Sequence, residues 1–282
     1  MSEEKWLVNP GQSKTVDIDG ITSLKVSLIG GQVDVIGHDE QTTRVEVSNV
    51  SGRDLKITAN GGRLEIDHPQ LRWDNFIDVF KAWNGKARAD VSVLVPRDIA
   101  LKLGTVNGDA LVSGLISNAK LSTVSGDIAA DTLVGDLELN AVSGELAVRN
   151  HLGAVKANTV SGDVTASGTL SAVSVDGVSS NVFLDVAGIP DRIRTNSVSG
   201  DLTLRIDGDV AARYKVNTVS GMLQVNDSIF RGASTHNFDY QDGPLDGHWI
   251  DVNVNSVSGN VSVVRRAGGE ASAHPEASTQ PA

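Results

Sequence analysis

The chain has 282 residues, of which 40% are hydrophobic and 4% aromatic, and its formal net charge is −11. A negative field of this size repels phosphate backbones and anionic lipid headgroups, which argues against nucleic-acid binding. The chain has no cysteine, which excludes disulfides, thiolate metal sites and cysteine nucleophiles.

Residues 1–20 carry several charges and no apolar stretch, which is not the pattern of a secretory signal. Further along, no run of apolar residues approaches the length that spans a bilayer. From the sequence we expect a protein with no signal peptide or transmembrane segment that is located in the cytoplasm, with the cell surface as the alternative.

Residues 1–103 are predicted to form a divergent N-terminal β region. Apolar and polar residues alternate in short runs, for example at Leu24, Val26 and Leu28, and this period of two is typical of strands with one buried face. The sequence Ile-Gly-Gly-Gln at residues 29–32 stands where a corner of the later repeat would stand. We therefore interpret this region as the first coils of the architecture that follows.

A short aromatic insertion at residues 71–86 interrupts the β pattern. Its large aromatic side chains recur at helical spacing, at Trp73, Phe76, Phe80 and Trp83. One interpretation is an amphipathic cap, because open β edges need covering. The other is a docking element in which these four residues are the candidate binding site for a protein partner. Peripheral membrane contact is the weaker version of docking, because the surrounding charges are not strongly basic.

Residues 104–266 contain a four-residue motif, Val-Ser-Gly-Asp, and its variants. Successive copies begin at valines that are 18, 18, 18, 18, 20, 21 and 38 residues apart. The last step is close to two coils, which predicts that the middle coil is remodelled. The valines are Val106, Val124, Val142, Val160, Val178, Val198, Val219 and Val257.

This repeat predicts an all-β fold, a single-chain parallel β-solenoid (β-helix) with about 18 residues per coil. Each unit reads as strand, corner, strand, corner, and it has too few residues to bury its own apolar face unless coils stack. Glycine suits the corner because it adopts positive φ without steric penalty. An antiparallel sandwich of regular short strands is the alternative. The structural repeat corners are predicted at Gly108, Gly126, Gly144, Gly162, Gly200, Gly221 and Gly259.

Two ladders of polar residues follow if equivalent positions stack. An asparagine precedes the corner valine by two residues in five copies, and stacked amides bond along a parallel array. An acidic residue follows the corner glycine in five copies, and stacked carboxylates repel one another unless they are solvated or bridged by a cation such as calcium; we favour the solvated row. The asparagines are Asn140, Asn158, Asn196, Asn217 and Asn255, and the acids are Asp109, Asp127, Glu145, Asp163 and Asp201.

The second interruption, residues 226–249, is predicted to be a remodelled coil with an extruded loop. It contains His236 and His248, but the six histidines of the chain share no metal-ligand spacing. The corner serines lack the Gly-x-Ser-x-Gly context of a nucleophile elbow. We therefore expect a protein that is not an enzyme, with no catalytic residue, metal site or cofactor. Residues 267–282, with glycines and prolines, are predicted to be a disordered tail.

Through the repeated Val-Ser-Gly-Asp corners, the chain resembles a bacterial β-strand-repeat family of unknown function that is commonly labelled "putative adhesin". The resemblance covers about residues 15–266 and includes the aromatic insertion before a Val-Pro-Arg strand at residues 95–97. It implies a β-solenoid, and some relatives are associated with the cell envelope and with envelope stress. The family has no established catalytic residues to carry over.

These observations predict a non-enzymatic structural or protein-interaction β-solenoid of the putative-adhesin type. Its expected partner is a protein, and self-association is left open. The alternative is a carbohydrate-binding or carbohydrate-active β-helix protein that uses a solenoid groove, for which Trp249 and Tyr240 are the aromatic candidates.

Overall fold

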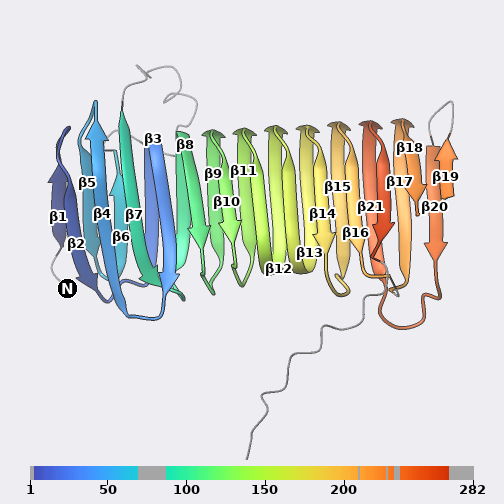
Figure 1. Cartoon of the computed structure of the whole chain (residues 1–282), viewed down its shortest axis with the longest axis horizontal. Coiled ribbons are helices and arrows are strands. Elements are labelled where there is room, and N and C mark those ends of the chain that lie inside the picture. Colours follow the sequence, from blue (N-terminus) through green and yellow to red (C-terminus); the bar gives the residue numbers. More distant parts are fainter. Residues whose placement is uncertain (1–2, 69–86, 209, 227, 232–235, 267–282) are drawn as a thin grey trace, which may run out of the picture.

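The computed structural model describes residues 3–68, 87–208, 210–226, 228–231 and 236–266, which form strands and turns and contain no helix. All 22 strands belong to one hydrogen-bonded sheet that winds along an elongated body (Figure 1). The prediction of an all-β protein is therefore confirmed. Within the described residues, no helix is long and apolar enough to cross a membrane.

The strands divide into an N-terminal group and a group that carries the repeat. The first group comprises β1 (Glu4–Val8), β2 (Lys14–Asp19), β3 (Ser23–His38), β4 (Thr42–Ser51), β5 (Leu55–Asn60), β6 (Arg63–Asp67) and β7 (Arg88–Pro96). The second comprises β8 (Ala100–Ser113), β9 (Ala119–Ser125), β10 (Ile128–Asp131), β11 (Leu137–Ser143), β12 (Leu146–Ser161), β13 (Val164–Ser179), β14 (Val182–Val186), β15 (Arg192–Ser199), β16 (Leu202–Ile206), β17 (Ala212–Ser220), β18 (Met222–Val225), β19 (Ser228–Arg231), β20 (His236–Asp242), β21 (Ile250–Ser258) and β22 (Val261–Arg265).

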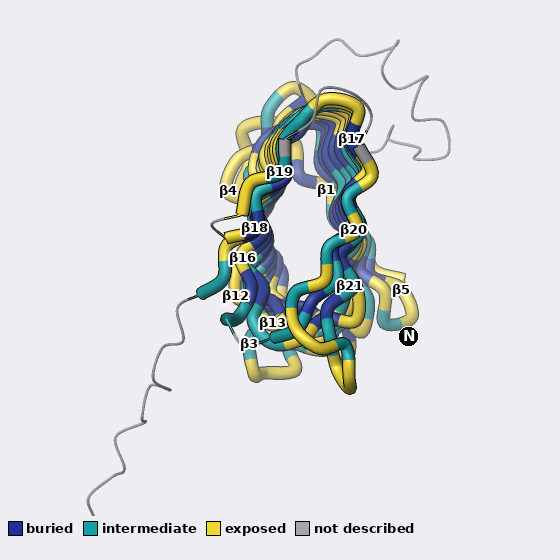
Figure 2. The backbone as a smooth tube through the Cα atoms, turned by 90° about the vertical axis from the view of Figure 1, so that its right-hand side faces the viewer, coloured by how far each residue is buried: buried dark blue, intermediate teal, exposed yellow. Residues whose placement is uncertain are grey.

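Two walls face each other across the body, as the view along its axis shows (Figure 2). The first wall contains the strands that lead into a Val-Ser-Gly corner, such as β9, β11, β15, β21 and β17. The second wall contains the strands that leave that corner, such as β10, β14, β16, β22 and β18. The long strands β3, β8, β12 and β13 contribute to both walls.

The core consists of apolar side chains that stack in register between the walls. In the first wall, Leu139 pairs with Leu121 on one side and with Ala157 on the other, always in parallel, and all three are fully buried. Each buried leucine contributes about 2 kcal/mol through the area that it removes from water. The strands that carry the repeat, β8 to β18 with β21 and β22, pair with one another in parallel. This pairing excludes the antiparallel sandwich.

Glycine is required at the Val-Ser-Gly corners because neighbouring coils approach closely there. Gly144 has a φ of 124°, and a Cβ atom on it would lie 2.1 Å from the carbonyl oxygen of Gly126 in the adjacent coil. No side chain can occupy such a space, since real Cβ contacts under 3.0 Å essentially do not occur. The corner predicted at residues 29–32 is confirmed, because Gly31 aligns with Gly108.

The N-terminal end of the stack is closed by antiparallel strands. β3 lies between β7 and β8 and is parallel to both. Outside it, β4 pairs antiparallel with β7 and β2, and β5 pairs antiparallel with β6 and β1. The N-terminal region thus continues the stack but ends it with reversed strands.

At the C-terminal end the coils do not stack in the order of the sequence. β21 lies between β15 and β17 and is parallel to both, and β22 lies between β16 and β18. The expectation of a remodelled middle coil is therefore wrong. Residues 226–249 instead supply β19 and β20, which pair antiparallel with β18 and β17 at the end of the stack.

Two sequence predictions fall on residues outside the described ranges. They are the aromatic insertion at residues 71–86, with the candidate partner-binding residues Trp73, Phe76, Phe80 and Trp83, and the tail at residues 267–282. Both stay predictions.

Candidate functional site

Six corner valines form an exposed apolar row along one edge of the body. Their serine neighbours are aligned, with Ser143 next to Ser161 and, further along, Ser258 between Ser199 and Ser220. The row lies where β11, β12, β13, β15, β21 and β17 end, at the upper edge of Figure 1. We call it the valine row; its members are Val142 (42% exposed), Val160 (49%), Val178 (48%), Val198 (51%), Val257 (50%) and Val219 (52%).

Folding alone does not explain valine at these positions. The first two corner valines, Val106 and Val124, are buried, whereas the six that follow are half exposed. A half-exposed strand position needs only a β-branched side chain, for which threonine serves as well. Continuous exposed apolar surface of this kind is typical of an interaction site.

The same wall carries cationic side chains farther from the corner. Along β12, Lys156, Asn158 and Val160 alternate with buried residues, so all three point outward. Lys156 lies in a groove of about 790 Å³ that crosses β9, β11, β12, β13 and β15. Arg192 and Arg194 also line it, and none of these three cations forms an ion pair with another described residue.

Another cation of the groove is neutralised. Lys120 Nζ lies 2.8 Å from Glu138 Oε1. This hydrogen bond is the main cause that holds the pKa of Glu138 below its usual range. The cations available to a ligand are therefore Lys156, Arg192 and Arg194, and they lie beside the carboxylates of Asp136 and Asp191, which also line the groove.

The predicted asparagine ladder is confirmed on the outer face of the first wall. Asn158 Nδ2 donates to Asn140 Oδ1 at 2.9 Å. At the C-terminal end, Asn217 donates to Asn255 and Asn255 donates to Asn196, both at 2.8 Å. These bonds run along the axis and fix the coils in register.

The acidic residues of the corners have a structural role that sequence reasoning missed. Asp109 Oδ1 accepts a hydrogen bond from the backbone N–H of Asp127 at 3.0 Å, and Asp127 Oδ1 accepts one from the N–H of Glu145 at 2.8 Å. Each of these two carboxylates thus binds the backbone of the next coil through its Oδ1 atom. An amide oxygen serves equally, since Asn181 Oδ1 accepts from the N–H of Asp201 at 3.1 Å.

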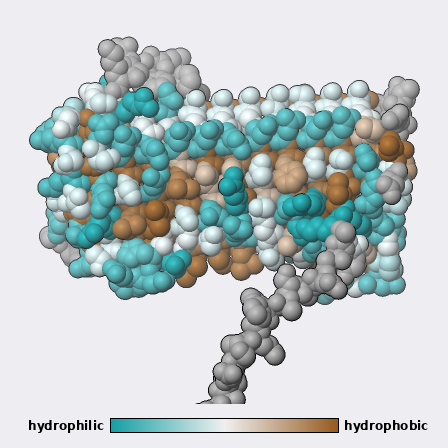
Figure 3. Space-filling view, in the orientation of Figure 1, coloured by the Kyte–Doolittle hydropathy of each residue, from teal (hydrophilic) through white to brown (hydrophobic). Residues whose placement is uncertain are grey.

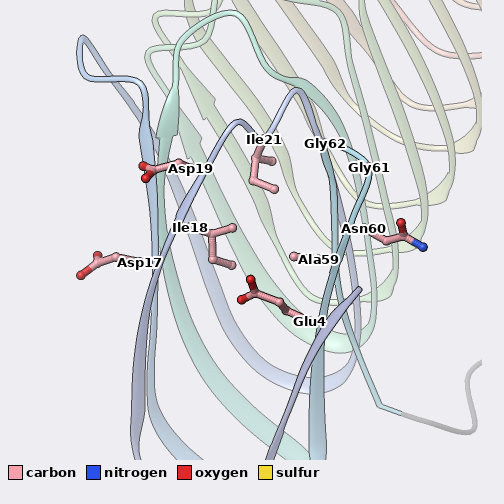
Figure 4. Close-up of a pocket in the computed structure, with 9 residues that line it drawn as sticks. All are labelled: Glu4, Asp17, Ile18, Asp19, Ile21, Ala59, Asn60, Gly61 and Gly62. Carbon is pink, nitrogen blue, oxygen red and sulfur yellow. The ribbon is translucent and has the colours of Figure 1, made fainter. Parts of the chain in front are cut away.

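A second hollow of about 350 Å³ lies at the N-terminal end and is lined by Glu4, Asp17 and Asp19 together with the turn at residues 59–62 (Figure 4). Asp17 is already engaged, with its Oδ1 atom 2.7 Å from Nε of Arg44. This hydrogen bond is the main cause that lowers the pKa of Asp17. The part of the chain that the structure describes contains no group of three acidic or histidine residues placed to hold a metal.

The second interruption closes the end of the core with aromatic rings. The ring of Tyr240 stacks on that of buried Tyr214 with centroids 6.2 Å apart, and Phe230 lies 5.5 Å from Tyr240 and 6.0 Å from Phe238. Burial raises the pKa of Tyr214 to about 12. Tyr240, which the sequence suggested as an aromatic candidate for carbohydrate binding, therefore packs against the core as part of the end cap.

Two of the acids near the histidines of this segment, Asp239 and Asp242, form ion pairs. Asp239 Oδ2 lies 2.5 Å from Arg213 Nη2, and Asp242 Oδ2 lies 2.8 Å from Arg265 Nη2. His248 is exposed. The two ion pairs join β20 to β17 and to β22.

These features define an all-β repeat protein whose outer surface, rather than an enclosed cavity, carries its exposed apolar and cationic groups. Figure 3 shows the other wall, where apolar and polar residues form bands along the body. The chain belongs to the family described as Toastrack DUF4097, whose model matches residues 21–264.

Several solved structures are similar to the chain over most of its length. A "putative lipid binding protein" from Parabacteroides distasonis shares 10% identity, with 91% of this chain and 98% of that chain covered and a TM-score of 0.47. A "putative adhesin" from Bacteroides fragilis shares 13%, with 91% and 99% covered and a TM-score of 0.41. A "putative cell adhesion protein" from Clostridium sporogenes shares 18%, with 94% and 99% covered and a TM-score of 0.28. A search of curated proteins gave no match.

Proposed function

We propose that the chain is a non-enzymatic β-solenoid scaffold, advancing by about 18 residues per coil, that binds a protein partner along its first wall. The observation that carries this proposal is the valine row, six half-exposed valines in register on an otherwise acidic molecule. At roughly 4.8 Å per coil, the row extends for roughly 24 Å. It offers a straight apolar strip to a strand or helix of the partner.

The cations of the groove predict the charge of the partner's surface. Four residues of extended chain separate Lys156 from Val160 and Arg194 from Val198, and six separate Arg192 from Val198. The cations therefore lie roughly 13 to 20 Å from the valine row. Lys156, Arg192 and Arg194 complement acidic side chains. The proposed partner therefore presents an apolar ridge flanked by acidic residues.

A non-catalytic role is consistent with how the corner acids are used. Asp109, Asp127 and Asp201 each accept a backbone hydrogen bond from the next coil. Their repetition is explained by stacking, without a reaction for them to perform.

The test compares two variants that each receive four threonines. The first changes Val142, Val160, Val178 and Val198, and the control changes exposed apolar residues outside the row, Ile36, Ile116, Val134 and Val264. Proteins retained from the host by the unmodified chain are identified, and the binding of each purified one is measured. We expect the first variant to weaken binding on the order of 100-fold, at roughly 0.7 kcal/mol per valine, and the control to bind normally.

Retention of the same proteins by both variants with equal affinity would refute the proposal. A further variant tests the cations: Arg192→Glu with Arg194→Glu should weaken binding at low salt more than Lys14→Glu with Arg149→Glu, which makes the same charge change elsewhere.

The second candidate is binding of a carbohydrate in the groove, supported by its elongated form. Against it, the residues that line the groove include no aromatic side chain, and Tyr240 packs on Tyr214. Glycan-array binding that is lost in Trp249→Ala would favour this candidate over the first. The cytoplasmic location stays a prediction, which cell fractionation would test.

A further inference from the structure

The C-terminal coil, β21 and β22 (residues 250–265), occupies a slot between two coils that both precede it in the sequence. The chain passes from β16 to β17 without filling this slot, forms β17 to β20, and then returns to it. At the N-terminal end, β6 and β7 also lie between strands that precede them, but each is antiparallel to one of its two neighbours. Among the described strands, β21 and β22 alone lie parallel between two strands that both come earlier in the chain.

The slot fits the C-terminal coil on both sides. Gly259 is needed there, because a Cβ atom on it would lie 2.0 Å from the carbonyl oxygen of Gly200. Asn255 joins the two flanking asparagines through its amide, as described above. Asn260 also bonds to both flanking coils. Its N–H donates to Asp201 Oδ1 at 2.7 Å, and its Oδ1 accepts from the N–H of Met222 at 3.2 Å.

The end of the coil is fastened to the connection that bypasses the slot. Nη1 of Arg265 donates to the backbone carbonyls of Asp207, Gly208 and Val210 at 3.3, 3.1 and 2.5 Å. Its Nη2 lies 2.8 Å from Asp242 Oδ2 at the end of β20. The coil therefore binds both the connection that bypasses the slot and the end of β20.

The connector between β20 and the coil, residues 243–249, is suited to opening. It has no strand pairing, most of its residues are exposed, and Gly243 and Gly247 both have positive φ. A glycine-containing connector of this kind changes direction at little steric cost.

We propose that the slot is an exchange site for a second copy of this chain, which inserts its own C-terminal coil there while receiving the coil of the first. The occupant is another copy because the slot demands an asparagine, a glycine and an asparagine at the spacing of Asn255, Gly259 and Asn260, and the C-terminal coil supplies them. Every contact of the closed chain is reproduced in the exchanged dimer, so its cost is mainly that of association.

Concentration decides between the two forms. A short connector gives the chain's own coil an effective concentration of about 1 mM at the slot, so exchange competes as the protein concentration approaches that value. We expect single chains in dilute solution and exchanged dimers in concentrated solution or after refolding at high concentration.

The test uses single-cysteine variants, since the chain has no cysteine of its own. Ser199 and Ser258 are aligned neighbours on either side of the slot boundary. Differently tagged Ser199→Cys and Ser258→Cys chains are refolded together from urea at about 1 μM and about 500 μM and treated with a short bis-maleimide. The chain with both substitutions serves as the control for cross-linking within one molecule.

The matched control mixes Ser143→Cys with Ser161→Cys, which are aligned corner serines of two coils before the connector. Exchange of the C-terminal coil leaves that pair within one chain. We expect a product of twice the single-chain mass that joins the two tags only for Ser199→Cys with Ser258→Cys, and only at the higher concentration. Absence of that product while the double variant cross-links internally, or an equal yield from the control pair, overturns the proposal.

Discussion

His68 makes the stability of the protein depend on pH in a direction that its environment fixes. The side chain is fully buried; its Nδ1 atom accepts a hydrogen bond from the backbone N–H of Ile29 at 3.3 Å, and its Nε2 atom has no partner among the described residues. Burial, with a smaller effect of the Arg53 charge, lowers its pKa from 6.5 to about 4. The unfolded chain therefore binds a proton at a higher pH than the folded one.

The sign and size of the effect follow from this difference. Because the folded pKa is depressed, the contribution of His68 to stability is complete above pH 6.5 and is lost as the pH falls toward 4. At about 1.4 kcal/mol per pH unit, the loss is roughly 1.4 kcal/mol at pH 5.5 and approaches roughly 3 kcal/mol near pH 4.

The assay is urea unfolding of the unmodified chain and of His68→Asn, whose amide oxygen can replace Nδ1 as acceptor but does not titrate. The free-energy difference between the two should shrink by roughly 1.4 kcal/mol between pH 7.5 and pH 5.5. Ile66→Val, a change at a neighbouring buried residue, should cost about 1 kcal/mol at both pH values. A difference for His68→Asn that does not change with pH would refute the reasoning.

Three further changes test the stacking. Gly144→Ala should destabilise by at least about 3 kcal/mol in urea unfolding, because its Cβ would lie 2.1 Å from a carbonyl oxygen, whereas Gly61→Ala, with nothing within 4 Å, should cost about 1 kcal/mol. Asp127→Asn should be nearly neutral and Asp127→Ala should cost about 1 kcal/mol, since only the alanine removes the acceptor; equal effects would contradict the ladder. Arg265→Met should increase amide hydrogen exchange in β17 and β22 before β9, and uniform exchange would contradict a local clamp.

Much of the fold could be predicted because the glycines and asparagines of the repeat indicate where the chain turns and how the coils stack. Glycine at Gly126 and Gly144 indicated corners, and asparagine at Asn140 and Asn158 indicated parallel stacking in register; both features are present. The corner valines were not recognised as a surface from the sequence. Alternation along β11 and β12 places Val142 and Val160 on the outer side with Asn140 and Asn158, but an apolar residue next to a corner is equally typical of the core.

The stacking order of the last coils could not be predicted from the period of the repeat either. All coils share the Val-Ser-Gly pattern, so its period alone does not tell which coil stacks on which. The step of 38 residues to Val257 suggested a missing coil, but a cap followed by a return of the chain gives the same spacing. The candidate surface shares this limit, because Val257 enters the valine row between Val198 and Val219 only through that return.

One residue nevertheless gives a physical reason for the observed order. In the corner ladder, Asp109, Asp127, Asp163, Asn181 and Asp201 each accept the backbone N–H of the next coil. The coil of β17 and β18 has Met222 at this position, which offers no such acceptor. This coil is the outermost member of the parallel stack, so no further coil offers an N–H to Met222. The N–H of Met222 itself donates to Asn260 Oδ1. Stacking in sequence order would place Met222 between Asp201 and Asn260 and leave the N–H of Asn260 without its acceptor, at a cost of about 1 kcal/mol. The return of the C-terminal coil therefore continues the ladder from Asp201 through Asn260 and leaves Met222 at its end, where no further N–H has to be bound.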